Sequence, residues 1–394
     1  MNNIKSDSLN IDSKTLYDFV FIGLGASNSL ILLSLIKKDL LANKKIAIIE
    51  SDSKKENDKT YCFWSFSEAP IVKDLSQIIS HSYSRIEVKS ISQGIEKQPY
   101  YFIKSIDLYE YTLNKSIEAS IPIYRVSAQT ILQVNENYAI NTSEGVINSK
   151  FVFDSRTPIY SQLVSKEIHL HQSFYGFHIK SEKDVFRKDT FEMMNFDVDQ
   201  SNYTQFIYTL PFASNESLVE LTRFGIDKID SAYAAIILNN EIKTKYGNYE
   251  IMADETGCIP MTNYWHPKNK LSGVLNTGAN ANLIKPSSGY GFKNMYEFAE
   301  IVSEKIKRKD LKNFNQIALK RKKRFRFYDS LLLTILKLWP YEGKRVFTRL
   351  FQKQKIHTIF TFLDEKTSII SEIKIFASLP IKPFLKALFL YIKK

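Results

Sequence analysis

The sequence predicts an α/β protein built around a dinucleotide-binding βαβ unit near the N-terminus. Residues 19–22 form a short β-branched and aromatic run that stops at two glycines, Gly23 and Gly25, and an apolar run with helical spacing follows. This order is typical of a strand, a tight turn and a helix. A second apolar run, 46–49, ends on Glu50. Together these features indicate a Rossmann-like unit whose glycine turn and helix N-terminus bind a pyrophosphate, and whose acid binds a ribose hydroxyl.

This unit departs from the usual fingerprint at Asn28, where a third glycine is typical. An ordinary βαβ unit with a solvated Glu50 is the alternative, and the combination of strand, turn, helix, strand and acid favours a dinucleotide site. The uncharged stretch 19–36 has the length of a membrane span. Its glycines, serines and Asn28 favour a buried βα unit instead.

The size and composition of the chain fit a large protein with an apolar ligand. Its 394 residues are enough for two lobes that share a core, and 13% of them are aromatic. We interpret the aromatic content as the walls of a long apolar cavity; an aromatic-rich genome is the alternative. Cys62 and Cys258 lie far apart in the sequence and lack metal-site spacing. We therefore expect reduced thiols in a cytoplasmic protein, and neither a metal site nor a signal peptide.

Positive charge is concentrated in one part of the chain. The net charge is +12, and the window 305–326 holds eleven Lys or Arg residues against the single acid Asp310. The window contains only two aromatic residues and no nucleic-acid-binding motif, so we expect no nucleic-acid partner. Because apolar and basic segments follow it, we favour an anionic membrane surface. A solvated basic helix face is the alternative.

The remaining patterns divide the chain into a disordered N-terminus, two halves of a cofactor domain, an inserted lobe and a helical end. Strand patterns occur at 85–88, 100–103, 123–126, 130–134, 138–140 and 151–156, and helical patterns at 107–117, 231–246 and 296–309. The strand at 151–156 contains Asp154, which we expect near the cofactor; a turn-capping Asp is the alternative. The predicted boundaries are 1–15 for the disordered segment, 16–171 and 250–310 for the dinucleotide-binding domain, 172–249 for a β-rich substrate lobe, and 311–394 for a basic helical region.

Several short motifs occur in a fixed order along the chain. They are Gly23-Leu24-Gly25-Ala26-Ser27-Asn28, Asp58-Lys59-Thr60-Tyr61-Cys62-Phe63-Trp64, Phe153-Asp154-Ser155-Arg156, Leu218-Val219-Glu220-Leu221-Thr222, Ile259-Pro260-Met261-Thr262, and Gly278 with Lys285-Pro286-Ser287-Ser288-Gly289-Tyr290-Gly291-Phe292. From about Tyr17 to the C-terminus, this set resembles the flavin-dependent lycopene cyclases of carotenoid biosynthesis. The chain departs from that family at Tyr61, where Trp is usual, at Thr157, where Gly is usual, and at Leu221, which replaces the second of two adjacent acids.

The resemblance implies a Rossmann-like FAD/NAD(P)-binding fold with an inserted substrate lobe. It implies closure of the linear ends of lycopene into β-ionone rings, started by a proton and neutral in redox. Reduced FAD would stabilise the cation, and NAD(P)H would only keep the flavin reduced. The residues that the resemblance and the βαβ pattern assign to the cofactor are Gly23, Gly25, Asn28, Glu50, Asp154, Gly278, Pro286, Gly289 and Gly291.

The resemblance assigns the initiating acid to Glu220. An alkene is a poor base, so the acid must be held protonated in a dry pocket. In a strand, Leu218, Glu220 and Thr222 share one face, which places Glu220 on a partly apolar wall. An edge-strand Glu220 facing water is the alternative. We expect Phe174, Phe177, Phe206 and Tyr208 to line a substrate tunnel, although core packing is the commoner use of such residues.

Two other functions remain open at this point. One is a flavin monooxygenase of another apolar isoprenoid, and the other is a non-catalytic binder of lipids or prenyl groups. For the cyclase we expect a peripheral, monotopic protein on the cytoplasmic face of the membrane, without a transmembrane span, because lycopene must enter from the bilayer. The apolar segment 384–392 is too short to span and is interrupted by Lys386.

Overall fold

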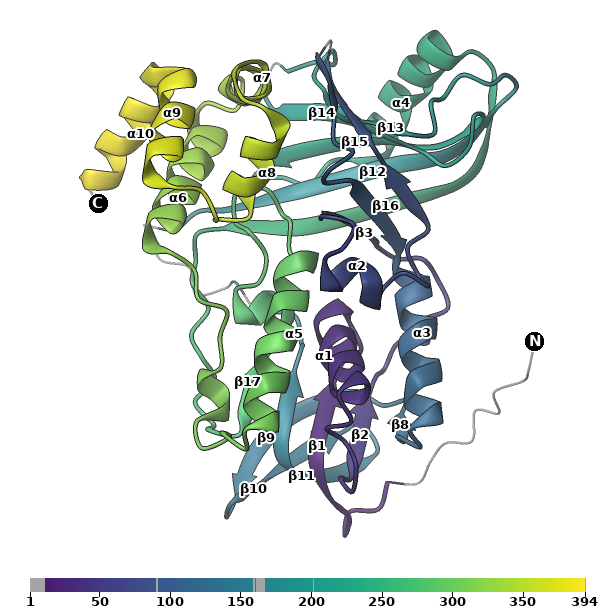
Figure 1. Ribbon diagram of the computed structural model, residues 1–394, viewed down its shortest axis with the longest axis vertical. Coiled ribbons are helices and arrows are strands. Elements are labelled where there is room, and N and C mark those ends of the chain that lie inside the picture. The colour runs from purple at the N-terminus through teal and green to yellow at the C-terminus, as the bar shows by residue number, and fades with distance from the viewer. Residues whose placement is uncertain (1–10, 90, 159, 161–166, 201, 394) are drawn as a thin grey trace.

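The structure is a computed structural model that describes residues 11–89, 91–158, 160, 167–200 and 202–393. Two large sheets lie one above the other, with a small sheet between them and a bundle of helices beside the upper sheet (Figure 1). Residues 1–10 of the predicted disordered N-terminus lie outside the described residues.

The first sheet is the predicted dinucleotide-binding unit. Its strands are β1 (Leu16–Ile22), β2 (Ile46–Ile49), β8 (Ile123–Tyr124), β9 (Ala128–Val134), β10 (Asn137–Thr142), β11 (Gly145–Asp154) and β17 (Val274–Asn276). The parallel order is β8-β2-β1-β11; β10 pairs with the first half of β11 and β17 with the second half. The carboxyl ends of β1, β2, β11 and β17 therefore meet at one edge, where doubly wound folds bind their ligands.

Helices cover one face of this sheet and a β-hairpin covers the other. The helices are α1 (Ala26–Lys37), α3 (Ser105–Glu118) and α5 (Phe292–Lys307). They share a core with Phe21, Ile48 and Phe153 of the sheet. Val20 and Val152 point to the opposite face, beneath the strands β9 and β10. All four residues of β2 are buried, as expected for a parallel strand that is covered on both sides.

The second sheet forms the lobe that was predicted to bind the substrate, called the substrate lobe below. Its order is β16 (Tyr249–Thr262), β12 (His169–Ser181), β15 (Glu216–Gly225), β14 (Thr204–Pro211), β13 (Thr190–Asn195), β5 (Arg85–Val88) and β6 (Ile91–Gly94). Helix α4 (Ser231–Tyr246) covers one face, and the side chain of Asp230 caps it by accepting from Tyr233 N at 2.8 Å. Because β16 belongs to this sheet, the predicted boundary at 250 was wrong: the long antiparallel pairing with β12 continues to Thr262.

The remaining elements connect the two lobes. The small sheet consists of β3 (Thr60–Trp64), β7 (Tyr100–Lys104) and β4 (His81–Tyr83), and the short helix α2 (Pro70–Asp74) lies between β3 and β4 in the chain (Figure 1). Two short 3-10 turns are η1 (Gly278–Ala281) and η2 (Phe314–Gln316). The C-terminal bundle contains α6 (Lys323–Leu338), α7 (Glu342–Lys353), α8 (Ile356–Leu363), α9 (Ile369–Ser378) and α10 (Ile381–Ile392).

The expectation of a protein without a transmembrane span can be compared with the lengths of the helices. Among the described residues, no single helix is both long enough and apolar enough to cross a bilayer. The helices α9 and α10 reach that length only as a pair, and they are bent by 117° at the break between them.

Candidate active site

The glycine turn between β1 and α1 leaves space for a ligand. Gly23 has a φ of 79°, and a Cβ there would lie 2.4 Å from Ser155 Oγ, so a side chain is excluded at this position. A Cβ at Gly25 would meet no protein atom within 4 Å. Ser27 Oγ is buried without a hydrogen-bond partner among the described residues. Open space and an unused donor at a helix N-terminus are the features that a phosphate group requires.

Asn28 and Glu50 hold this turn in shape. The Asn28 amide donates to the carbonyls of Ile22 and Gly23 at 3.0 and 2.7 Å, and its Oδ1 accepts from Thr277 Oγ1 at 2.9 Å. Glu50 accepts from Leu24 N at 2.6 Å. Asn28 is fully buried, and its hydrogen bonds join α1 to β1 and to the end of β17. A glycine at this position would let the helix approach the strand closely but would form none of these side-chain hydrogen bonds. The hydrogen bond from Leu24 N does not use all the lone pairs of the Glu50 carboxylate, so Glu50 can still accept from a ribose hydroxyl. This predicted contact stays a prediction.

Asp154 ends β11 beside the same turn and is buried. Its two oxygens accept from Arg156 Nε at 2.9 Å and Arg156 Nη2 at 2.7 Å. Its backbone carbonyl accepts from Thr277 N at 2.8 Å. The forked ion pair fixes the Arg156 guanidinium at the carboxyl edge of the sheet. Gly278, which follows Thr277, has a φ of 60° and begins η1.

The loop from Lys285 to Gly291 lies between the two lobes. Gly289 has a φ of 71°, and a Cβ there would lie 2.4 Å from Gln172 Oε1 of the substrate sheet. Gly291 is the N-cap residue of α5. Lys285 is buried, and its Nζ pairs with Asp329 at 3.0 Å and Glu365 at 3.1 Å. The loop is therefore tied to β12 on one side and to the C-terminal helices on the other.

Glu220 lies in the middle of β15 on a dry wall. It is 7% exposed, and Leu218 on the same face is completely buried. Burial raises the pKa of the Glu220 carboxyl well above its usual value, and the nearby Glu255 carboxyl raises it further, against a hydrogen bond from Thr222 Oγ1 that lowers it. Burial and the neighbouring carboxyl both favour the neutral form of Glu220, which is the form that the sequence argument requires. Leu221 points to the opposite face, into the core beneath α4.

A tyrosine cluster stands over Glu220. Tyr208 lies opposite Glu220 in the pairing of β14 with β15. Its hydroxyl and that of Tyr290 each lie 3.0 Å from the hydroxyl of Tyr100. The Tyr208 hydroxyl also donates to Cys62 Sγ at 3.7 Å. Burial raises the pKa of the Cys62 thiol to about 12, so this thiol is protonated and inert.

The predicted tunnel residues divide between the two faces of the sheet. Phe174 and Phe206 both pair with Thr222, so they share the face of Glu220 with Tyr208. Phe177 pairs with Val219 and lies in the core under α4. Phe177 therefore lies on the face opposite Glu220, because its odd separation from Phe174 along β12 places the two side chains on opposite faces, and its predicted place in the substrate tunnel stays a prediction.

Glu255 is the site residue that the sequence reasoning missed. It lies on β16, in the strand segment just before the predicted Ile259-Pro260-Met261 motif. Its Oε2 lies 3.3 Å from His178 Nε2 and 3.5 Å from Thr60 Oγ1. The alternation of β16 could have indicated the face on which Glu255 lies, but not the strand that it pairs with.

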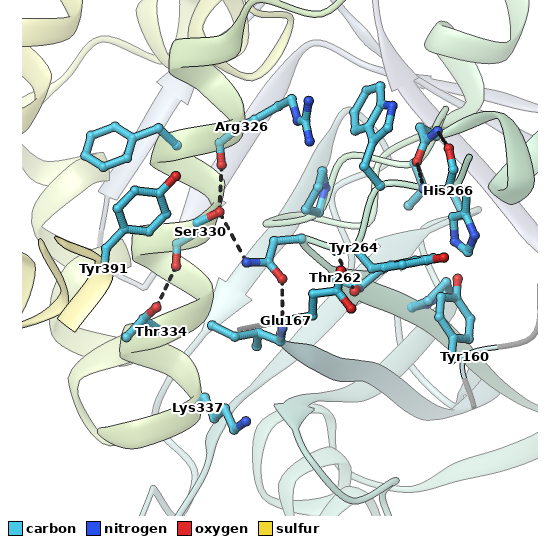
Figure 2. A pocket seen from close by; sticks show the side chains of 18 of the residues that line it. Tyr160, Glu167, Thr262, Tyr264, His266, Arg326, Ser330, Thr334, Lys337 and Tyr391 are labelled. Atoms are coloured by element: carbon cyan, nitrogen blue, oxygen red, sulfur yellow. Dashed lines mark hydrogen bonds between the residues drawn. The ribbon is translucent and has the colours of Figure 1, made fainter. Parts of the chain in front are cut away.

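A separate cavity of about 760 Å³ lies between the C-terminal bundle and the end of β16. Figure 2 shows Ser330, Thr334 and Tyr391 on one side of it and Tyr264 and His266 on the other. The Arg326 guanidinium lies 4.0 Å from the centre of the Trp265 ring at its rim. Pro286 is the predicted cofactor residue that lines this cavity, and Glu220 does not line it.

A family model described as "Lycopene cyclase protein" matches residues 18–389 of the chain. The match spans both lobes and most of the C-terminal bundle. The chain belongs to the lycopene cyclase family. This confirms the resemblance that the sequence motifs indicated. No curated protein sequence matches this cyclase-family chain.

Several solved structures share the fold of this lycopene cyclase family member. A geranylgeranyl bacteriochlorophyll reductase-like protein from Thermoplasma acidophilum superimposes with a TM-score of 0.55 at 13% identity, over 95% of this chain and 96% of that one. A p-nitrophenol 4-monooxygenase from Pseudomonas putida gives 0.56 at 10% identity, over 94% and 98%. A halogenase in complex with FAD gives 0.54 at 11% identity, over 89% and 82%. The predicted Rossmann-like flavoprotein fold is confirmed.

Proposed function

We propose that this member of the lycopene cyclase family closes the linear ends of lycopene into β-ionone rings and so makes β-carotene. The observation that carries the proposal is Glu220, a buried carboxyl whose pKa is raised by burial and which faces a wall of tyrosines. A protonated carboxylic acid in a dry site is the group that an alkene needs as its proton donor.

The proposed reaction begins and ends with a proton. Glu220 delivers its proton to the terminal double bond of the chain end, which leaves a tertiary cation. The electron pair of the next double bond closes the ring, and loss of a ring proton then forms the ring double bond. The proton gained equals the proton lost, so the product is an isomer of the substrate. The faces of Tyr208 and Phe206 on the same side of the sheet suit a cationic intermediate, because aromatic faces attract positive charge.

The cofactor proposed for this site is FAD, with NAD(P)H as its reductant. The open space at Gly25, the unpartnered Ser27 Oγ and the N-terminus of α1 fit its pyrophosphate. Gly278 leaves room for close approach, since the nearest atom to a Cβ there is Ser27 Cβ at 3.9 Å, whereas the space at Gly289 and Gly291 is already occupied by protein atoms. When bound in its reduced form, FAD would supply negative charge that stabilises a carbocation. The test of the reductant is to add NADH or NADPH to the protein with oxidised flavin bound: the nucleotide that reduces the flavin should bleach its visible absorbance.

The proposed partner is the cytoplasmic surface of a membrane, because lycopene does not dissolve in water. Helices α9 and α10 form the outer edge of the C-terminal bundle (Figure 1). They expose large apolar side chains together with lysines. The apolar residues are Ile369, Ile370, Ile373, Ile381, Leu385, Phe389 and Ile392, and the exposed lysines among them are Lys374, Lys382, Lys386 and Lys393. An apolar face flanked by cations fits a monotopic protein that lies in the interface.

The test is expression in a bacterial host that accumulates lycopene, followed by chromatography of the pigments. We expect cyclised carotenoid of unchanged mass from the native chain and unchanged lycopene from Glu220→Gln. A product heavier by one oxygen would select a monooxygenase instead. Lycopene that is bound but not converted, by a protein that carries reduced flavin, would select a lipid-binding protein on the same fold.

A further inference from the structure

Glu220 faces a second carboxyl across a glycine. In the second sheet β12 runs between β15 and β16, and Gly176 of β12 pairs with Glu220 on one side and with Glu255 on the other. Paired residues in antiparallel strands share a face, and neighbouring strands lie about 4.8 Å apart. Both glutamate side chains therefore stand on the same face with no side chain between them.

The space above Gly176 is already filled by its neighbours. A Cβ at this position would lie 3.1 Å from Leu218 Cδ1, 3.2 Å from Glu220 Cβ and 3.3 Å from Glu220 Cα. These distances are tighter than ordinary van der Waals contact, so even alanine would push Glu220 away. The glycine allows the two acidic side chains to approach.

One oxygen of Glu255 is anchored and the other is free. His178, on the same face of β12, and Thr60 of β3 both contact Oε2. Oε1 is buried and has no hydrogen-bond partner among the described residues. A buried carboxylate oxygen without a donor is costly unless a proton is shared with it. The protonated carboxyl of Glu220 is the adjacent donor that could satisfy it.

We propose that Glu255 is the second carboxyl of the cyclisation site, a positioning residue that carries the negative charge while Glu220 carries the proton, and that keeps Glu220 ready to take the ring proton back after closure. Two carboxyls that lie close together cannot readily ionise together, so one proton stays between them. Glu220 donates that proton to the substrate, and the proton released from the ring restores it. The pair therefore ends each cycle as it began. This inference rests on the proposed cyclase activity.

The chain position of the partner follows from strand geometry. An acid at Leu221, beside Glu220 in sequence, would point into the core under α4, where Leu221 lies with Val219 and Leu238. Adjacent residues in a strand face opposite sides. A carboxyl that interacts with Glu220 must come from a neighbouring strand, and β16 supplies it.

The other titratable groups that face the pair are neutral hydroxyls, a thiol and one imidazole. Burial raises the pKa of Tyr100, Tyr208 and Tyr290, and of the Cys62 thiol. These four groups carry no charge near neutral pH and do not compete with Glu255 for control of Glu220. The imidazole is His178, which contacts Glu255 and stacks on Phe212 at 5.6 Å between ring centres.

The test compares pH profiles of cyclisation in three reconstituted proteins: the native chain, Glu255→Gln and the matched control Asp254→Asn. Asp254 precedes Glu255 on β16, is exposed, and pairs with Phe177 of the opposite face. Cyclisation needs protonated Glu220, so activity falls as pH rises through its pKa. Removing the neighbouring charge lowers that pKa. We expect the alkaline limb of Glu255→Gln to move down by about one pH unit or more, which is a tenfold loss at a fixed pH on the limb. Asp254→Asn should keep the native profile.

A second readout does not depend on turnover. The infrared band of a protonated carboxyl should be present in the native protein at neutral pH, absent in Glu220→Gln, and weakened in Glu255→Gln. If Glu255→Gln fails to fold or to hold flavin, Glu255→Asp takes its place in the test. The shorter side chain moves the negative charge away from Glu220 by one methylene, so the alkaline limb of the pH profile should move in the same direction by a smaller amount. A native profile in whichever of these variants is folded overturns the inference. A native protein that does not cyclise lycopene overturns the proposed function instead.

Discussion

Gly176 and Glu220 lie directly opposite one another on β12 and β15, and a Cβ added at Gly176 would lie 3.2 Å from that of Glu220. The position of the buried acid therefore depends on the absence of a side chain on the next strand. This relation couples the fold of the substrate sheet to the proposed chemistry, because any displacement of Glu220 changes both its burial and its distance from Glu255.

The first prediction concerns this glycine. Gly176→Ala should lower cyclisation about tenfold or more, because a 1 Å misplacement of a reacting group can cost more than that, while flavin content stays native. Gly225→Ala is the matched control on β15, where the atoms nearest to a Cβ would be Asp227 O at 3.5 Å and Arg223 at 3.8 Å, which are ordinary van der Waals contacts. Rates and flavin absorbance of both purified variants are the measurement. Equal activity of the two variants would contradict the steric argument.

The second prediction separates cofactor binding from folding. Gly25→Val should remove the flavin and leave thermal stability of the flavin-free protein unchanged, because the space beyond Gly25 contains no protein atom within 4 Å. Gly23→Val should instead lower stability, since its φ of 79° and the nearby Ser155 Oγ both exclude a side chain. Flavin absorbance and the melting temperature of the flavin-free proteins distinguish the two. Full flavin occupancy in Gly25→Val would place the cofactor elsewhere.

The third prediction concerns the proton donor. Glu220→Gln keeps the shape of the side chain and removes its proton, so cyclisation should fall by at least about a hundredfold. Glu220→Asp should retain weak activity. Asp154→Asn is the contrast, because it breaks the ion pair with Arg156 at the cofactor edge and should lower flavin occupancy. Native β-carotene production by Glu220→Gln would show that another group donates the proton.

Glu220→Gln, which should lower activity, should raise the stability of the folded protein at high pH. Burial raises the pKa of Glu220 in the folded state, so the folded protein binds more protons than the unfolded chain above the ordinary pKa of glutamate. The stability contributed by neutral Glu220 is present at low pH and is lost as pH rises through the raised pKa. Gln does not titrate, so Glu220→Gln should gain stability over the native protein as pH rises. Urea midpoints at acidic and alkaline pH measure this, and a difference that does not grow with pH would refute it.

Local patterns in the sequence predicted the elements better than the contacts between them. Helix 231–246 and the strand–turn–helix unit around Gly23 follow from short-range spacing, and the structure contains both. Glu220 was found because a motif surrounds it. Glu255 was missed because the pairing of β12 with β16 joins residues far apart in the chain, and no local pattern specifies that register.

The basic window shows a second limit of reading the sequence alone. Arg321 is buried in ion pairs with Asp329 and Glu365, and Arg324 pairs with Glu372 through two hydrogen bonds. Charge that appeared to be surface charge is partly internal, and two of its acidic partners, Glu365 and Glu372, lie more than forty residues further along the chain. Counting charges in a window cannot detect such pairs.

The window also lies apart from the exposed apolar face. Helix α5 runs alongside α1 and away from the substrate sheet (Figure 1), and Phe314, in the first half of the window, packs on Phe19 and Phe151 of the first sheet. The basic residues around Lys307 therefore lie toward the opposite end of the molecule from α10. Two membrane signals were expected from the sequence, the basic window 305–326 and the apolar segment 384–392. The apolar face of α9 and α10, which includes that segment, carries its own lysines, so its proposed binding to anionic lipid does not require the positive charge of the window.

The last prediction tests that face. Ile370 is 68% exposed on α9 and Phe389 is 58% exposed on α10. The double variant Ile370→Glu/Phe389→Glu should bind vesicles containing anionic lipid at least tenfold more weakly, because burying one such side chain contributes about 1.5–3 kcal/mol and about 1.4 kcal/mol is a factor of ten. Ile236→Glu is the matched control, since Ile236 is 65% exposed on α4, away from the bundle. Co-sedimentation with vesicles gives the partition. High salt should release only part of the native protein, because the apolar contribution is not screened. If Lys307→Glu weakened binding and the double variant did not, the membrane contact would lie at the end of α5 rather than on α9 and α10.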